Sequence, residues 1–230
     1  MIKFIGDSYR KIKSHIAQLA KECERDPEDI TLLAVTKTLP MEHILSAYEV
    51  GGRHFGENKV QEALEKIQNA PDDIGWHLIG TLQKNKVRKV IGKFSLIHSV
   101  DSLELAEKIE TCSEEAKEVT KVLLQVNTSG EQSKHGLSIR QWRNRFEEIL
   151  SLNNISVEGL MTIAPFSDDT KVVRECFRKL RDFREELQEL SGNRANIHHL
   201  SMGMTNDYPI AIEEGATILR IGSAIFGDRD

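Results

Sequence analysis

Apolar and polar residues recur along the chain in two alternating patterns. Short runs rich in aliphatic and β-branched residues have the length and content of buried strands. The segments that follow them repeat apolar residues every third or fourth position, which is typical of amphipathic helices. The predicted strands cover residues 31–36, 53–55, 76–79, 95–100, 121–126, 155–161, 197–200 and 216–221. The sequence therefore predicts eight strand–helix units.

Strands that alternate with helices pair in parallel, either in an open doubly wound sheet or in a closed barrel. Eight units within 230 residues favour the closed (β/α)8 TIM barrel. No linker or low-complexity tract interrupts the pattern, so we expect one α/β domain over residues 1–230. An additional helix, at about residues 7–24, precedes the first strand and places Ile12, Ile16, Leu19 and Ala20 on one face.

Composition narrows the class of protein. Hydrophobic residues make up 39% and charged residues 29% of the chain, as in ordinary globular proteins. The net charge of -5 argues against nucleic-acid binding, and no apolar run is long enough to cross a membrane. Three widely spaced cysteines and a charged N-terminus indicate reduced thiols and the cytoplasm. His198 and His199 lack acidic neighbours, so we expect no metal site.

Lys37 directly follows the first predicted strand. In a β/α barrel the binding and catalytic groups lie at the C-terminal ends of the strands and in the loops after them. Burial there would disfavour the charged ammonium, and the neutral amine is the form that makes a Schiff base with a carbonyl. A lysine that extends from the rim into solvent fits the same position equally well.

Two turns containing glycine follow the seventh and eighth predicted strands. Ser201 and Gly203 lie in the first turn, and Gly222 and Ser223 lie in the second. Barrels often bind phosphate with these two loops and the start of a short extra helix, although such glycines also occur in plain tight turns. A phosphate site near a strand-end lysine indicates a phosphorylated carbonyl compound, either pyridoxal 5′-phosphate (PLP) or a sugar phosphate.

Arg220 distinguishes between these two ligands. It lies between Leu219 and Ile221 in a strand, so its side chain should point away from theirs. A charge directed into the barrel mouth needs a partner. The pyridine nitrogen of PLP would serve, and so would an ion pair with Glu57 or Asp207.

Two basic features remain open. Five positive charges between Lys84 and Lys93 form either the solvated face of a helix or a phosphate-binding patch. Lys134, in the loop after the fifth strand, is either an exposed lysine or a second amine that assists in loading and releasing PLP.

Motifs across nearly the whole chain resemble those of the pyridoxal phosphate homeostasis protein family. Their specificity lies in their combination, since each motif alone is weak. They are ITLLAVTK at 30–37, FGEN at 55–58 with VQE at 60–62, WHLIGTLQ at 76–83, GLM at 159–161, LSMGM at 200–204 and RIGSAIFG at 220–227. Thr205 departs from the serine found in many relatives but keeps the hydroxyl.

The resemblance implies a barrel like the N-terminal domain of alanine racemase, with PLP held covalently on Lys37. It implies that Arg220 faces the pyridine nitrogen and that Ser201, Gly222 and Ser223 hold the phosphate. Asn58 and His77 are implied as neighbours of the ring. From the residues alone, Asn58 also suits a helix N-cap, and His77 also suits a satisfied position in the core.

Three functions remain to be compared. A non-catalytic PLP carrier that serves PLP-requiring apo-enzymes is favoured, with a racemase and a Schiff-base aldolase for a sugar phosphate as alternatives. A racemase needs acid–base groups on both faces of its substrate, and the chain stops about ten residues after the eighth strand, before the further domain of alanine racemase. Arginine keeps its own proton and would leave the pyridine nitrogen of PLP unprotonated. An unprotonated ring is a weaker electron sink for carbanion chemistry. A closed barrel without exposed sheet edges favours a monomer.

Overall fold

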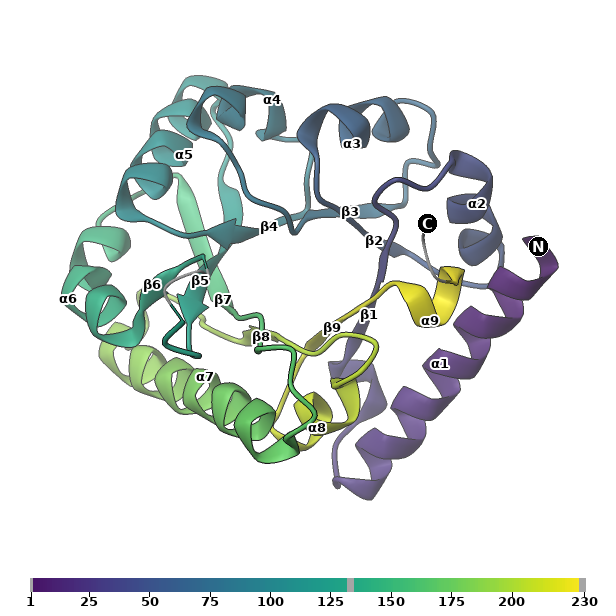
Figure 1. Ribbon diagram of the computed structural model, residues 1–230. Coiled ribbons are helices and arrows are strands. Elements are labelled where there is room, and N and C mark those ends of the chain that lie inside the picture. Colours follow the sequence, from purple (N-terminus) through teal and green to yellow (C-terminus); the bar gives the residue numbers. More distant parts are fainter. Residues whose placement is uncertain (1, 132–134, 228–230) are drawn as a thin grey trace.

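The chain forms a closed barrel of parallel strands surrounded by helices (Figure 1). The computed structural model describes residues 2–131 and 135–227. Its barrel strands are β1 (Thr31–Val35), β2 (His54–Glu57), β3 (Gly75–Leu78), β4 (Leu96–Val100), β5 (Thr120–Asn127), β7 (Ile155–Met161), β8 (His199–Ser201) and β9 (Ile218–Ile221). Pairing of β4 with β5 and of β1 with β9 closes the ring, which confirms the (β/α)8 architecture. A short strand, β6 (Leu137–Ser138), pairs with β5 outside the ring.

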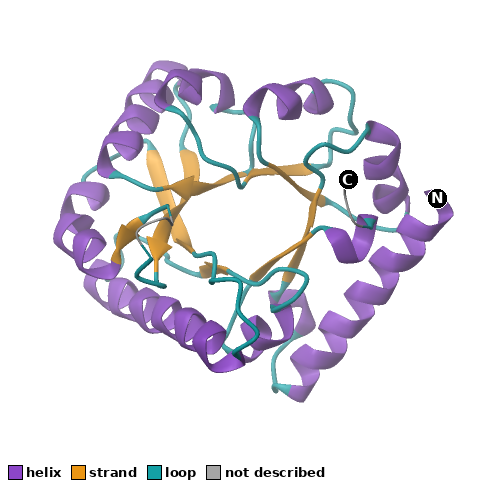
Figure 2. Cartoon of the chain, in the orientation of Figure 1, coloured by secondary structure: helices purple, strands orange, loops and turns teal. Residues whose placement is uncertain are grey.

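The helices form an outer layer around this ring, which Figure 2 separates by colour. They are α1 (Ile2–Glu22), α2 (Met41–Glu49), α3 (Val60–Ile67), α4 (Val87–Val90), α5 (Leu103–Ala116), α6 (Ile139–Leu150), α7 (Thr170–Ser191), α8 (Tyr208–Glu213) and α9 (Ser223–Phe226), with 3-10 turns at Pro27–Asp29 and Lys84–Lys86. The main apolar core lies between this layer and the strands. Within the described residues, no helix is both long enough and apolar enough to cross a bilayer.

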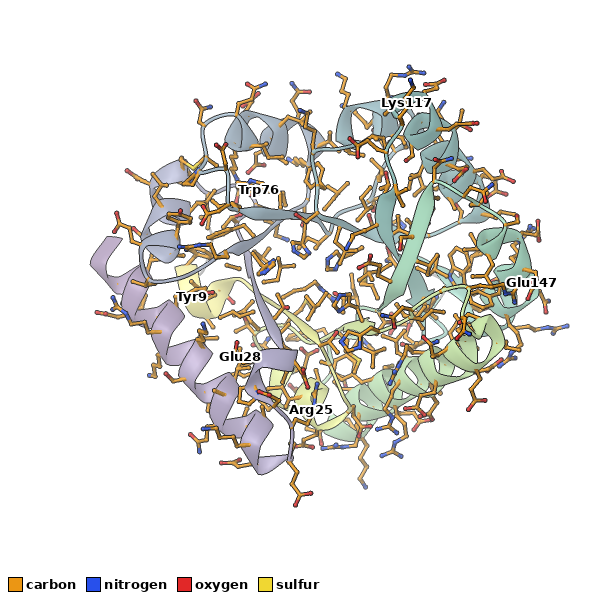
Figure 3. All side chains as sticks on the ribbon, turned by 180° about the vertical axis from the view of Figure 1, so that it is seen from behind. Tyr9, Arg25, Glu28, Trp76, Lys117 and Glu147 are labelled. Atoms are coloured by element: carbon orange, nitrogen blue, oxygen red, sulfur yellow. The ribbon has the colours of Figure 1, made fainter. Side chains whose placement is uncertain are left out.

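The extra N-terminal helix is longer than the sequence pattern predicts. It begins at Ile2 rather than near residue 7, and it ends at Glu22. Ile5 and Tyr9 are buried, which extends its apolar face by a turn, and Gly6 leaves room for Val50 next to α2. Arg25, just after the helix, donates to the carbonyls of Ile212 and Ala216 and so ties α1 to the end of α8 (Figure 3).

The basic segment 84–93 is not the single helix that the charge pattern predicts. It is a 3-10 turn over Lys84–Lys86 followed by one helical turn, α4. Val87 and Val90 are buried, so the apolar positions fix the segment against the barrel. The start of α3 also differs from the sequence pattern. The N-cap position is Lys59, whose side chain makes no capping hydrogen bond, so the capping role considered for Asn58 is wrong.

Inside the barrel, side chains alternate inward and outward along each strand, as closure requires. Leu33, Leu96, Leu123, Met161 and Ile218 form a small apolar cluster separate from the main core. Arg220 lies two residues beyond Ile218 on the same strand, so the two side chains share the inner face. The predicted direction of Arg220, opposite to Leu219 and Ile221, is confirmed by this arrangement.

Candidate functional site

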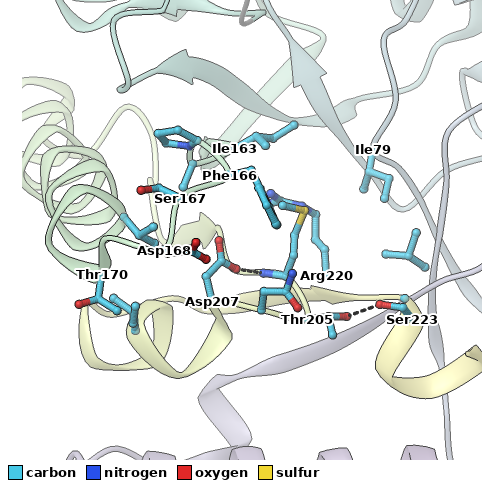
Figure 4. A pocket seen from close by; sticks show the side chains of 18 of the residues that line it. Ile79, Ile163, Phe166, Ser167, Asp168, Thr170, Thr205, Asp207, Arg220 and Ser223 are labelled. Atoms are coloured by element: carbon cyan, nitrogen blue, oxygen red, sulfur yellow. Dashed lines mark hydrogen bonds between the residues drawn. The ribbon is translucent and has the colours of Figure 1, made fainter. Parts of the chain in front are cut away.

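A cavity of about 770 Å³ opens where the C-terminal ends of several strands and their loops meet (Figure 4). Its walls come from widely separated parts of the chain. The polar or backbone-lined part contains Lys37, Asn58, Thr205, Asn206, Asp207, Arg220, Gly222 and Ser223. This is the end of the barrel at which β/α barrels place their binding groups.

Lys37 reaches this cavity from the end of β1 and is partly buried. The next residue, Thr38, has a φ of 64°, a left-handed conformation that is costly for a β-branched residue. The backbone N–H of Thr38 donates to Glu62 Oε1 at 2.5 Å, and its hydroxyl donates to the Lys37 carbonyl. The chain is thus turned sharply just after the lysine and held there by α3.

A buried ion-pair cluster supports the same strand end. Lys66 of α3 donates to Glu57 Oε1 at 2.7 Å, to Glu62 Oε1 at 2.6 Å and to the carbonyl of Thr36 at 2.8 Å. Burial raises the pKa of Glu57, despite the hydrogen bonds from Lys66 and Thr36. Burial alone would also raise the pKa of Glu62, but hydrogen bonds from Lys66 and Thr38 hold it below its usual value. The cluster therefore fixes the backbone on both sides of Lys37.

Arg220 lies at the base of the cavity and is 5% exposed. Its Nη1 donates to Ser201 Oγ at 2.7 Å and its Nη2 donates to the Thr162 carbonyl at 2.8 Å. Neither acceptor is charged, and no carboxylate lies within ion-pair distance among residues 2–131 and 135–227. Burial lowers the pKa of Arg220 to about 10, with Asp207 acting against it from a distance.

The alternative ion pairs for Arg220 are therefore wrong in this structure. Glu57 is paired with Lys66, and Asp207 Oδ1 instead accepts from the backbone N–H of Met204 at 2.5 Å. A buried guanidinium that has only neutral partners retains an unbalanced charge next to the cavity. That charge would attract an acceptor or anion entering from the cavity.

Hydroxyls and glycine backbone gather on one side of the cavity. Ser223 Oγ donates to Thr205 Oγ1 at 3.2 Å, so the loop after β8 and the start of α9 meet there (Figure 4). Gly222 lies between Arg220 and Ser223 in the chain, and all three residues line the cavity. Hydroxyl donors around a glycine turn suit a small anionic group.

The opposite wall is more apolar and comes from the loop between β7 and α7. Ile163, Ala164 and Phe166 line it, and Phe166 is 91% exposed at the mouth. The sequence patterns did not identify this loop or Thr205 as part of the site. A strand-end rule would have included the loop, since it follows β7.

The structure brings together five of the seven residues expected at the site: Lys37, Asn58, Arg220, Gly222 and Ser223. The other two, His77 and Ser201, are buried below the cavity and are absent from its lining. Ser201 Oγ contacts Arg220 and His98, and His77 lies between His98 and His54. Their predicted contacts with a ligand remain predictions. Lys134 lies outside the described residues.

Residues 8–230 match the family model for the N-terminal domain of alanine racemase. The pyridoxal phosphate homeostasis protein of Aquifex aeolicus is 44% identical over 218 residues, covering 93% of this chain and 95% of that protein. The Bos taurus protein of the same name is 40% identical, covering 98% of this chain and 88% of that protein.

Solved structures agree with these sequence relatives. PipY of Synechococcus elongatus with PLP bound is 38% identical and has a TM-score of 0.81, covering 92% of this chain and 100% of that chain. Alanine racemase of Clostridium difficile has a TM-score of 0.76 at 18% identity and shares the fold; the match covers 97% of this chain and 57% of that chain. The chain therefore belongs to the alanine racemase N-terminal domain family and, within it, to the pyridoxal phosphate homeostasis proteins.

Proposed function

We propose that this protein binds PLP as a Schiff base on Lys37 and carries it in support of PLP homeostasis, without substantial catalytic turnover. The observation that carries the proposal is the buried Arg220, which has no carboxylate partner among the described residues and lines the same cavity as Lys37. A buried cation without a counter-charge is costly, so its presence beside a cavity favours a ligand that accepts from it.

PLP has three features that match three parts of this cavity. Its aldehyde suits the amine of Lys37. Its phosphate suits the hydroxyls of Thr205 and Ser223 and the backbone at Gly222. Its pyridine nitrogen is an acceptor and suits the guanidinium of Arg220, which can only donate. A sugar phosphate would satisfy the first two parts but leave Arg220 without a comparable acceptor.

The relatives support the same ligand. Proteins of 44% and 40% identity are named pyridoxal phosphate homeostasis proteins, and PipY of Synechococcus elongatus has been solved with PLP bound. Bound PLP would supply an electron sink for chemistry at an amino-acid carbon, and an arginine at the ring nitrogen would weaken that sink by leaving the nitrogen unprotonated. This favours carrying the cofactor over using it.

A racemase is the second candidate, because the alanine racemase family shares the fold. It would need proton donors and acceptors on both faces of its substrate. The ionisable side chains that line the described cavity are Lys37, Asp168, Asp207 and Arg220. Asp207 is engaged by the Met204 backbone N–H, and Arg220 does not give up its proton under ordinary conditions. We therefore rank racemase activity below carriage.

The proposal extends to the compartment, the oligomeric state and the partners of the protein. We propose that it is a cytoplasmic monomer that delivers PLP to PLP-requiring apo-enzymes. The three cysteines, which form no disulfide in the structure, support a reducing compartment. The closed ring of strands, which leaves few sheet edges for pairing with a second chain, supports a monomer.

A visible spectrum before and after borohydride reduction tests the proposal. Purified protein mixed with PLP should absorb as a Schiff base, and reduction should attach the cofactor to the peptide that contains Lys37. Lys37→Ala should remove both signals, whereas Lys59→Ala, which changes an exposed lysine just after β2, should retain them. Retained trapping in Lys37→Ala, or trapping on another lysine, would refute the assignment.

A further inference from the structure

A hydrogen-bonded row of side chains leads from Arg220 through the inside of the barrel to its opposite end. Ser201 Oγ lies 2.8 Å from His98 Nδ1, His98 Nε2 lies 2.9 Å from His77 Nδ1, and His77 Nε2 lies 3.1 Å from His54 Nδ1. With the 2.7 Å bond from Arg220 to Ser201, four consecutive bonds join five residues. His54 begins β2 and is exposed, so the row ends in solvent.

The row crosses the barrel rather than following one strand. Arg220 and Ser201 belong to β9 and β8, whereas His98, His77 and His54 belong to β4, β3 and β2. Ser201 and His98 are separated by 103 positions in the sequence. The row therefore also joins opposite walls of the barrel beneath the cavity.

One direction of donation along the row starts from Arg220 and uses the hydroxyl proton of Ser201. Arg220 can only donate, so Ser201 Oγ accepts from it and its own hydroxyl proton is available for His98 Nδ1. A neutral imidazole that accepts at one nitrogen donates from the other. In this direction His98 donates from Nε2 to His77 Nδ1, and His77 donates from Nε2 to His54 Nδ1.

The surroundings keep the inner rings neutral, as this direction requires. His98 is fully buried, and burial lowers its pKa well below the usual value, with His77 and Arg220 adding to the effect. Burial lowers the pKa of His77 to about 3, with His54 and His199 as further causes. Partial burial of its ring also lowers the pKa of His54, whose residue as a whole is exposed. A protonated ring would have two donors and would break the sequence of donations.

We propose that His98, His77 and His54 are positioning residues that act through Ser201 to hold the guanidinium of Arg220 toward the cavity. Without the row, Ser201 Oγ can rotate away, and Arg220 loses one of the two acceptors that fix its plane. The inference rests on the proposed function only for the identity of the ligand that Arg220 meets. The row itself is a property of the protein without ligand.

NMR on the 15N-labelled protein without PLP tests the row directly. We expect His54, His77 and His98 to be neutral rings that carry their proton on Nε2 at pH 7.5. We expect separate guanidinium N–H signals for Arg220, because its rotation is hindered. His98→Phe should merge these signals, whereas His98→Gln, which retains a donor and an acceptor, should keep them separate. Proton placement on Nδ1, or unchanged Arg220 signals in His98→Phe, would overturn the proposal.

PLP titration gives the second readout, with a control from the same barrel interior. Loss of one intramolecular hydrogen bond should weaken PLP binding about five- to tenfold in His98→Phe, with a smaller loss in His77→Phe and the smallest in His54→Phe. His199→Phe is the control, because His199 Nδ1 bonds Thr217 Oγ1 and lies outside the row. Equal losses in His98→Phe and His199→Phe would show a general packing effect and refute the row. Failure of the unaltered protein to bind PLP would refute the proposed function alone.

Discussion

Two buried cations lie near the Lys37 end of the barrel, and they differ in whether a carboxylate balances their charge. Lys66 is 9% exposed and has three acceptors, two of which are carboxylates. Arg220 is 5% exposed and has two neutral acceptors, with no ion pair among the described residues. An ammonium has three protons to donate, so Lys66 is fully satisfied, whereas a guanidinium has five.

The difference separates a structural charge from a binding charge. A buried ion pair is costly to break, because removal of one partner leaves the other charge desolvated. Lys66 therefore belongs to the scaffold that holds the turn after Lys37. Arg220 already bears the cost of an unpaired buried charge, and a ligand acceptor would reduce that cost. The comparison predicts that replacement of Lys66 mainly lowers stability, whereas replacement of Arg220 mainly weakens ligand binding.

Replacement of Lys66 should have the largest effect on stability. Lys66→Met leaves the buried Glu57 without its counter-charge, so we expect a loss of about 3–5 kcal/mol in the free energy of unfolding at pH 8. Urea unfolding measures this. Lys121→Met, which breaks the exposed pair with Glu158, is the control and should cost less than about 1 kcal/mol.

The same variant should show a characteristic pH dependence. Burial raises the pKa of Glu57 in the folded protein, and the bonds from Lys66 that oppose this rise are absent in Lys66→Met. Between the unfolded pKa of Glu57, about 4.3, and its higher folded pKa, the folded state binds more protons than the unfolded state. The free energy of unfolding therefore falls as pH rises through this range. The deficit should be smallest near pH 4 and full above the folded pKa. A deficit that does not depend on pH would contradict the role of Glu57.

Replacement of Arg220 should affect binding more than stability. A hydrogen bond from a charged donor contributes about 1.5–3 kcal/mol, so Arg220→Met should weaken PLP binding about 10- to 100-fold in a spectroscopic titration. Its unfolding free energy should change less than that of Lys66→Met, because loss of a desolvated charge offsets the lost bonds to Ser201 and Thr162. Arg220→Lys should restore part of the binding. If Arg220→Met bound PLP normally, or unfolded as easily as Lys66→Met, the distinction between the two cations would be wrong.

Local sequence rules predicted what lies within one strand or turn. Strand parity predicted that Arg220 points opposite to Leu219 and Ile221, and the strand-end rule predicted that Lys37 lies at the end of the barrel where the cavity opens. The capping box that Ser138 and Gln141 form at the start of α6 is local in the same sense, since both residues and the backbone they bind are neighbours in the chain.

Features that depend on barrel closure were not predicted from the sequence. His98 lies in β4, where all five residues are buried, so the burial pattern does not distinguish it from its neighbours. Its partner Ser201 reaches it only when β8 and β4 face each other across the barrel. The boundary of α1 was missed for a similar reason, because burial of Ile5 against other elements extends the helix. The partners of Lys66 likewise come from α3 and the ends of β1 and β2.

The smallest predicted effect tests what the Lys66 cluster holds in place. Thr38 has a left-handed backbone, and the only described side chain that accepts from its N–H is Glu62, the second partner of Lys66. Thr38→Gly removes the steric cost of that conformation, partly offset by the greater freedom of glycine when unfolded, so stability should rise by about 0.5–1 kcal/mol. Thr111→Gly, in the exposed interior of α5, should instead lower stability by a few tenths of a kcal/mol. Urea unfolding of both variants decides the point. If Thr38→Gly is no more stable than the unaltered protein, the turn after Lys37 is not strained, and the cluster then stabilises β1, β2 and α3 without holding that turn against its own preference.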